Sequence, residues 1–214
     1  MRKEFTENKS LLFSLVFLIC FFIINFLRGS IFNSINQDID LWAASINNGF
    51  FTIPAIIISI TFDTAALAII SLAIGGLLFI FHYRRYGLLL LSSMAGAALL
   101  VEMFKMLIRS SRPLNEILRT TSYSFPSGHV TSTVVFFGIL TYFVWKHWHT
   151  IKTKVITCVA YVFVISVVSF DRIYLNVHWF SDVIGAIFLG SFWLAFCIYV
   201  FNRLISSKKQ DIRR

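Results

Sequence analysis

The chain has 214 residues, of which 57% are hydrophobic and only 14% are charged, and phenylalanine alone occupies 24 positions. A soluble domain of this size carries about 25% charged residues, so the composition excludes an ordinary soluble enzyme. The net charge of +9 does not indicate nucleic-acid binding, because lysine and arginine in a membrane protein mark cytoplasmic loops and phospholipid contacts. We therefore expect one integral-membrane domain, residues 1–214, with membrane lipids and not nucleic acid as its partners.

Several apolar runs approach the roughly 20 residues that a helix needs to cross a bilayer. The first run is longer than the hydrophobic part of a signal peptide and lacks a small-residue cleavage site, so we expect it to remain as a span. Residues 31–49 are mixed in character and predict an interfacial helix. Pro54 and Asp63 interrupt the next apolar stretch, so that 50–62 is expected to be only partly embedded. The prediction is an all-α polytopic protein with six transmembrane helices, near 11–27, 64–82, 87–108, 128–146, 154–171 and 179–203.

Basic residues predict the orientation of these spans. Four basic segments fall on one side of a six-span arrangement, and the enrichment of lysine and arginine in cytoplasmic loops places both termini in the cytoplasm. The basic residues of these segments are Arg2, Lys3, Lys9, Arg84, Arg85, Lys146, Lys152, Lys154, Arg203, Lys208, Lys209, Arg213 and Arg214. Six cations fall on the opposite side: Arg28, Lys105, Arg109, Arg112, Arg119 and Arg172. Five of these six cluster in two outer loops beside polar motifs, which indicates a shared task.

The first of these motifs is Lys105-x6-Arg112-Pro113. If the helix continues through residue 112, the two cations lie two turns apart on one face, and Pro113 then helps to end the helix. A cation placed in the middle of the bilayer costs about 2.5–3.5 kcal/mol. An anion-binding pocket at the helix ends therefore explains Lys105 and Arg112 better than lipid-facing positions do, although both side chains can also snorkel to lipid phosphates.

The second motif, Pro126-Ser127-Gly128-His129, stands at the start of a predicted span. Ser127 is a good candidate for the N-cap of that helix. The free backbone N–H groups at a helix N-terminus form an anion site, and Gly128 would let an anion approach closely. This segment therefore predicts a second part of a phosphate-binding site.

The third motif is Arg172-x5-His178-x3-Asp182. On a helix, residues four apart share a face, so Asp182 could hold one imidazole nitrogen of His178 and leave the other free to attack. That is the arrangement of an oriented nucleophile. The alternative is a structural polar pair between helices.

In order and internal spacing, these three segments resemble the signature of the type 2 phosphatidic acid phosphatases, the PAP2 superfamily. The family pattern is K-x6-RP, PSGH and SR-x5-H-x3-D, and the matches lie within 105–182. The resemblance implies the helical core that this family shares with vanadium haloperoxidases and bacterial acid phosphatases. The serine that precedes the arginine in the family pattern is Asp171 here. A carboxylate facing a phosphate would repel it, so we expect Asp171 to turn away or to pair with a cation such as Arg172.

The resemblance also implies roles for the residues. His178 would attack phosphorus and form a phosphohistidine, Asp182 would orient its ring, and His129 would protonate the leaving oxygen and then activate water. The phosphate would be held by Lys105, Arg112, Ser127, Gly128 and Arg172. No metal and no other cofactor is expected, because fixed cations supply the charge stabilisation that phosphoryl transfer requires.

The expected function is a membrane lipid phosphatase with its site at the outer interface, acting on a phosphomonoester or diphosphate head group. Phosphatidylglycerophosphate and undecaprenyl diphosphate are the favoured substrates, with phosphatidate and lipid A phosphate as alternatives. Phosphoryl transfer to another lipid and non-catalytic lipid transport stay open as other functions. Arg109 and Arg119 either anchor the protein at the membrane interface or recognise a lipid head group. No oligomeric state is predicted.

Overall fold

The computed structural model describes residues 2–211, with side chains described for 9–206. Long apolar runs fold as helices because a helix satisfies every backbone hydrogen bond internally, as the bilayer requires. The described chain forms eight helices, which confirms the all-α prediction: α1 (Arg2–Leu27), α2 (Ile31–Ile46), α3 (Gly49–Thr61), α4 (Thr64–Ile80), α5 (Arg84–Ile108), α6 (Gly128–His147), α7 (Ile151–Tyr174) and α8 (Phe180–Asp211).

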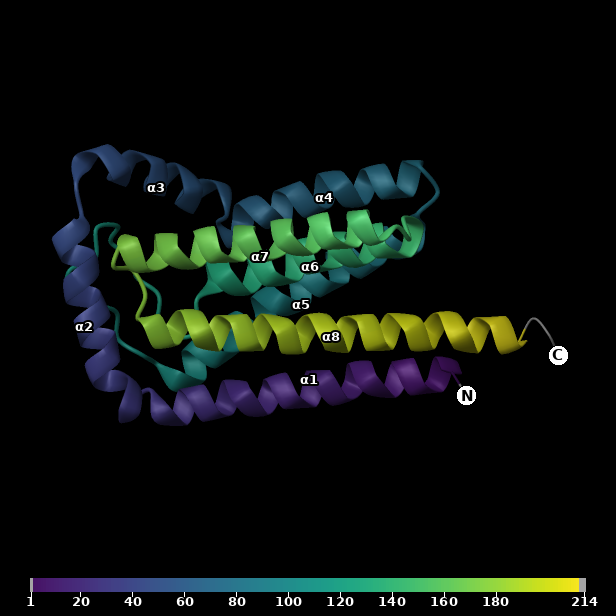
Figure 1. Cartoon of the computed structure of the whole chain (residues 1–214), viewed down its shortest axis with the longest axis horizontal. Helices are drawn as coiled ribbons and strands as arrows, with labels where there is room; N and C mark the ends of the chain where they lie inside the picture. The colour runs from purple at the N-terminus through teal and green to yellow at the C-terminus, as the bar shows by residue number, and fades with distance from the viewer. Residues whose placement is uncertain (1, 212–214) are drawn as a thin grey trace.

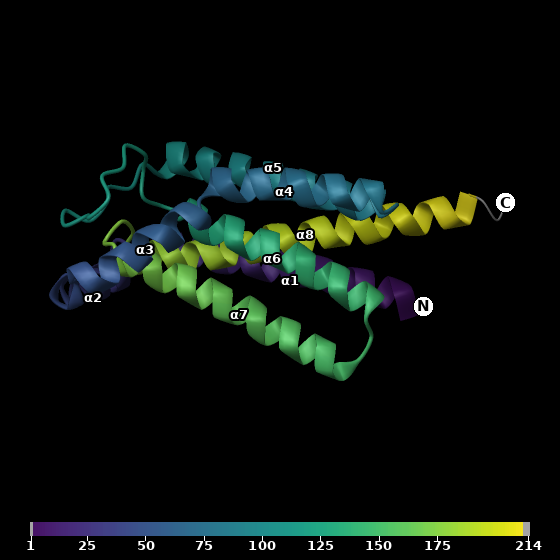
Figure 2. The same ribbon diagram turned by 90° about the horizontal axis from the view of Figure 1, so that it is seen from above.

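Helices α1, α4, α5, α6, α7 and α8 run along the long axis of the molecule, whereas α2 crosses one end of the bundle (Figures 1 and 2). Helix α1 packs along α8, α4 packs on α5, and α6 contacts α5, α7 and α8. The beginning of α1 and the end of α8 lie together at the end of the bundle opposite α2. The helix predicted for 31–49 is therefore present and lies across the bundle end, as an interfacial helix would.

Five helices are long and apolar enough to cross a membrane, namely α1 from Lys9, α5, α6, α7 and α8 as far as Ser206. The predicted span at 64–82 corresponds to α4, which is apolar but has only 17 residues, at the short limit of a spanning helix. Helices α2 and α3 form a pair bent by 118°. The multi-pass membrane architecture is confirmed, with five or six spans among the described residues.

The core is centred on α6, whose buried residues face several neighbours. Val135 and Ile139 pack in a cluster with Leu67, Leu90 and Met94 from α4 and α5. A second cluster joins α6 to α7 and α8 through Val130, Val134, Val168, Val183 and Ala186. This packing fixes the beginning of α6 against the end of α7 and the beginning of α8, which is where two of the three motifs lie.

Several predicted helix limits are wrong by a few residues. Helix α5 begins at Arg84 and α7 at Ile151, so cations expected in loops occupy helix ends, from which long side chains can still reach the interface. Pro54 lies inside α3 and does not end it, because its missing N–H removes one backbone hydrogen bond and leaves the remaining ladder intact. Arg213 and Arg214 lie outside the described residues, as do the side chains of Arg2, Lys3, Lys208 and Lys209.

Candidate active site

The three motifs converge at the end of the bundle crossed by α2. Lys105 lies in the last turn of α5, Gly128 begins α6, Arg172 lies in the last turn of α7, and Asp182 lies in the first turn of α8. The loop 109–127 and the turn 175–179 connect these helix ends at the same end of the molecule (Figure 1). Stretches far apart in the chain therefore meet in one place.

His178 is buried in the turn before α8 and is not part of that helix. The expectation that His178 and Asp182 share one helix face is therefore wrong, but the two side chains still meet. His178 Nδ1 lies 3.5 Å from Asp182 Oδ2, and Asp182 is anchored because its Oδ2 accepts from the Trp179 N–H at 3.0 Å. A carboxylate that receives the N–H at the start of its own helix forms half of a capping box, which explains why Asp182 points back toward the turn.

Ser124 completes this pair, although no pattern in the sequence singled it out. Its hydroxyl donates to Asp182 Oδ2 and lies 3.4 Å from His178 Nδ1. Since Nδ1 faces two oxygen atoms, the neutral ring carries its proton there and leaves Nε2 unprotonated. This is the tautomer that a histidine nucleophile requires.

Lys105 and Arg112 are brought together by a loop and not by a continuous helix. Helix α5 ends at Ile108 with Arg109 in the left-handed conformation, so the expected two-turn spacing on one face does not occur. Instead, Ser122 Oγ accepts from Lys105 Nζ at 3.4 Å and from Arg112 Nη2 at 3.0 Å. Arg112 also donates from Nη1 to the carbonyl of Val177, next to His178.

Ser127 and Gly128 form the second part of the candidate phosphate site. Ser127 is the N-cap of α6, as predicted, but its side chain makes no capping hydrogen bond. Its hydroxyl is buried and has no hydrogen-bond partner in the described structure, which leaves it available to a ligand. A Cβ at Gly128 would lie 4.0 Å from Lys105 Nζ and 3.2 Å from Thr64 Oγ1, so the glycine keeps the space beside the ammonium group open.

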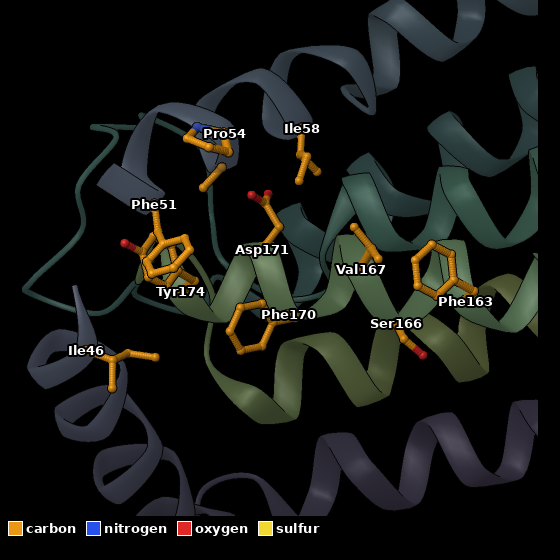
Figure 3. Close-up of a pocket in the computed structure, with 11 residues that line it drawn as sticks. Ile46, Phe51, Pro54, Ile58, Phe163, Ser166, Val167, Phe170, Asp171 and Tyr174 are labelled. Carbon is orange, nitrogen blue, oxygen red and sulfur yellow. The ribbon is translucent and has the colours of Figure 1, made fainter. Parts of the chain in front are cut away.

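Arg172 is almost fully buried and pairs with its neighbour Asp171. Asp171 Oδ2 accepts from Arg172 Nε at 3.0 Å and also from Nη2. The structure therefore agrees with one of the two arrangements expected for Asp171, a pair with Arg172. Figure 3 shows its carboxylate directed into the space between α7 and α3.

His129 lies against the break between α3 and α4. Its Nε2 lies 3.2 Å from the Ser59 carbonyl and 3.5 Å from Asp63 Oδ2. Asp63 also caps α4, because its Oδ1 accepts from the Ala65 N–H at 2.8 Å. The sequence named no partner for Asp63, since the contact joins residues 66 positions apart.

His178 lies within the electrostatic influence of three cations, Arg112, Arg172 and Lys105. Two of them, Lys105 and Arg172, are paired with the carboxylates of Glu102 and Asp171. His129 interacts electrostatically with Arg172 and His178. Burial, followed by these cations, lowers the pKa of His178 well below its ordinary value. The ring is therefore neutral, and able to act as a nucleophile, in mildly acidic as well as neutral solution.

Arg109 and Arg119, two further cations that the sequence analysis predicted on the outer side, do not join the cluster. Arg109 and Arg119 are both exposed, and Arg109 Nε donates to the Met106 carbonyl at 3.1 Å. Among the described side chains, no three His, Cys, Asp or Glu residues are grouped as a metal site. Ser122 and Ser124 are the residues that sequence reasoning missed, and their signal in the sequence was the polar loop directly before the Pro126–His129 segment.

A buried histidine backed by a carboxylate and surrounded by cations defines a class of site that binds phosphate and can attack it. The profile of the PAP2 superfamily matches residues 86–206, more than half of the chain, so the chain belongs to the PAP2 superfamily. The fold is that of the crystal structure of a transmembrane PAP2-type phosphatidylglycerolphosphate phosphatase from Bacillus subtilis, with a TM-score of 0.80 and 24% identity over 87% of this chain and 94% of that one.

Two curated relatives are also similar in sequence. Phosphatidylglycerophosphatase B of Bacillus subtilis (strain 168) is 32% identical over 135 residues, which cover 61% of this chain and 66% of that protein. Undecaprenyl-diphosphatase of Sulfolobus acidocaldarius is 34% identical over 122 residues, which cover 53% of each chain. The matched region thus spans less than two thirds of the length of either relative.

Proposed function

We propose that this chain is an integral membrane lipid phosphatase, one domain over 1–214, that hydrolyses a phosphomonoester or diphosphate head group through a phosphohistidine. The observation that carries the proposal is the buried His178, with Ser124 and Asp182 at one ring nitrogen and the field of Lys105, Arg112 and Arg172 around it. An oriented neutral imidazole and preorganised cations are the two requirements of this chemistry.

In the first step, His178 Nε2 forms a bond to phosphorus while the bond from phosphorus to the leaving oxygen breaks. His129 donates a proton to that oxygen. In the second step, His129 takes a proton from water, and the resulting hydroxide displaces the histidine to release inorganic phosphate. Asp182 stabilises the positive charge that develops on the ring, while the candidate phosphate ligands hold the non-bridging oxygens: Lys105, Arg112, Ser127, Gly128 and Arg172.

The names of the two relatives support phosphatidylglycerophosphate or undecaprenyl diphosphate as the substrate. The cluster of motif residues lies at the end of the bundle opposite the beginning of α1 and the end of α8 (Figure 1). With the basic segments at the latter end, both termini are cytoplasmic and the site is at the outer interface.

Phosphate release by the purified protein in detergent tests the proposal. A panel of phosphatidylglycerophosphate, undecaprenyl diphosphate, phosphatidate and a short-chain soluble phosphate would establish hydrolysis and the need for a lipid tail. His178→Ala should lower release by more than about 10³-fold, as expected for loss of a nucleophile, and should abolish trapping of labelled phosphate on the protein. His149→Ala, an exposed residue outside the site, is the matched control. Lipid binding without any release would indicate a transporter instead.

A further inference from the structure

Asp171 carries a buried oxygen that no other group satisfies. The residue is only 2% exposed, and its Oδ2 takes both hydrogen bonds from Arg172. Its Oδ1 is buried and has no hydrogen-bond partner in the described part of the chain. A buried acceptor left unpaired is unfavourable, so a group that donates a hydrogen bond to it would be stabilised there.

Asp171 itself lines a cavity of about 550 Å³ between α3 and α7. In Figure 3 the Asp171 carboxylate points from α7 into the space below Pro54 and Ile58 of α3, with Phe51 to one side of it. The lining is otherwise almost wholly apolar, which suits the hydrocarbon part of a lipid.

The two other polar side chains of the cavity are already satisfied. Ser166 Oγ donates to the Val162 carbonyl at 2.9 Å, and the Tyr174 hydroxyl donates to the Asn48 carbonyl at 3.1 Å. Among the side chains that line the cavity, Asp171 therefore has the acceptor, Oδ1, that receives no hydrogen bond in the described structure. Because an ionised carboxylate can only accept, the missing partner is an O–H or N–H group.

The geometry points to Asp171 as a specificity residue that accepts a hydrogen bond from a free hydroxyl on the substrate, close to the phosphate that Arg172 binds. This inference rests on the proposed function. Asp171 Oδ2 is bonded to Arg172, so a ligand hydroxyl at Oδ1 would lie a few bonds from a phosphate held by the guanidinium group. A glycerol linker between lipid and terminal phosphate carries such a hydroxyl, whereas a polyprenyl diphosphate and phosphatidate do not. The site therefore selects a phosphate ester of a lipid-linked glycerol.

A matched pair of substrates tests this inference. Phosphatidylglycerophosphate is compared with an analogue in which propane-1,3-diol replaces the head-group glycerol, so that only the free hydroxyl is missing. The wild-type protein should prefer the hydroxylated lipid by about tenfold or more in kcat/KM, the scale of one hydrogen bond to a buried charged group. Asp171→Ser, which restores the residue of the family pattern, should reduce this ratio to less than about threefold. Ser166→Ala, a change in the same cavity wall, should leave the ratio as in the wild type.

The possible outcomes separate this inference from the proposed function. Equal wild-type kcat/KM for the two lipids would overturn the role of Asp171 and leave lipid phosphatase activity standing. An equal fall on both lipids in Asp171→Ser would also overturn it, because Asp171 would then act only by positioning Arg172. No phosphate release from any lipid of the wider panel would defeat the proposed function itself. If the variant does not fold, equal wild-type kcat/KM values for the two lipids still overturn the inference.

Discussion

At the scale of single residues, the two nitrogens of His178 have different surroundings. Nδ1 faces Ser124 and Asp182, whereas the cations Lys105, Arg112 and Arg172 provide the surrounding positive field. The 3.5 Å separation from Asp182 is long for a direct hydrogen bond, so the serine hydroxyl that bonds to Asp182 contributes to orienting the ring. Ser124 is therefore a positioning residue for the proposed nucleophile.

Ser124→Ala should lower kcat by about 10- to 100-fold, the scale of a hydrogen bond to a charged group, with little change in KM. The expected cause is that the ring loses a neighbour that fixes its orientation while substrate contacts persist. Steady-state phosphate release measures both constants. Thr133→Ala is the control, because its buried hydroxyl has no hydrogen-bond partner in the described structure. A rise in KM with unchanged kcat would assign Ser124 to substrate binding instead.

The pH dependence should reflect the lowered pKa of His178. The nucleophile must be neutral, so the acid limb of kcat/KM should lie below the ordinary histidine pKa of about 6.5. Removing a nearby positive charge makes protonation easier, so Arg112→Gln should move the acid limb to higher pH. A pH profile between about 4 and 9 measures it. Arg119→Gln, at an exposed position, should leave the limb in place, and an unmoved limb in Arg112→Gln would contradict the electrostatic account.

At the scale of helices, close approach between α6 and α8 sets the position of both motif-bearing helix ends. A Cβ at Gly190 would lie 2.9 Å from Val134 Cβ and 3.2 Å from the Thr131 carbonyl. The backbone of α8 therefore packs directly against α6, as small residues permit between membrane helices. In contrast, a Cβ at Gly76 of α4 would meet nothing within 4 Å.

Gly190→Ala should separate these two helices and destabilise the protein. Overpacking a tight contact costs about 1–3 kcal/mol, which corresponds to a fall in Tm of about 2–10 °C for a chain of this size. Thermal unfolding in detergent measures the change. Gly76→Ala is the matched control, and it should leave Tm unchanged or raise it slightly because alanine favours the helix. Equal Tm values for the two variants would show that the α6–α8 contact can relax freely.

At the scale of the whole molecule, the bundle separates two chemically different ends. The candidate active site lies at the end crossed by α2, whereas the beginning of α1 and the end of α8 lie at the other end (Figure 1). Arg84 and Lys152, in the first turns of α5 and α7, are basic residues of the latter end. The proposed orientation follows from this asymmetry.

Cysteine labelling in intact cells should report that orientation. In a background with Cys20, Cys158 and Cys197 replaced by alanine, Arg119→Cys should react with a membrane-impermeant maleimide added outside. Lys152→Cys should react only after the membrane is permeabilised. The reverse pattern would place the site on the cytoplasmic side.

Sequence reasoning predicted the helical class, a helix within 31–49 and the meeting of the three motifs, because hydrophobic length and motif spacing can be read directly from the sequence. It did not predict how the motifs meet. Helix α5 ends before Arg112, and His178 lies in a turn, so continuous helical spacing was the wrong geometry for both motifs. Ser122 and Asp63 act through contacts that join distant segments, and spacing within one segment carries no information about such contacts.

The side chain of His129, which begins on α6, contacts the junction between α3 and α4. Its imidazole rests on Ser59 and Asp63, at the junction of α3 and α4, whereas His178 is held from α7, α8 and the loop before α6. If insertion of a lipid chain tilted α3 outward, His129, the proposed proton donor, would shift relative to His178, the proposed nucleophile, and substrate entry would then be coupled to proton transfer. Spin labels on α3 and α7 whose separation stays constant when lipid is added would exclude this link.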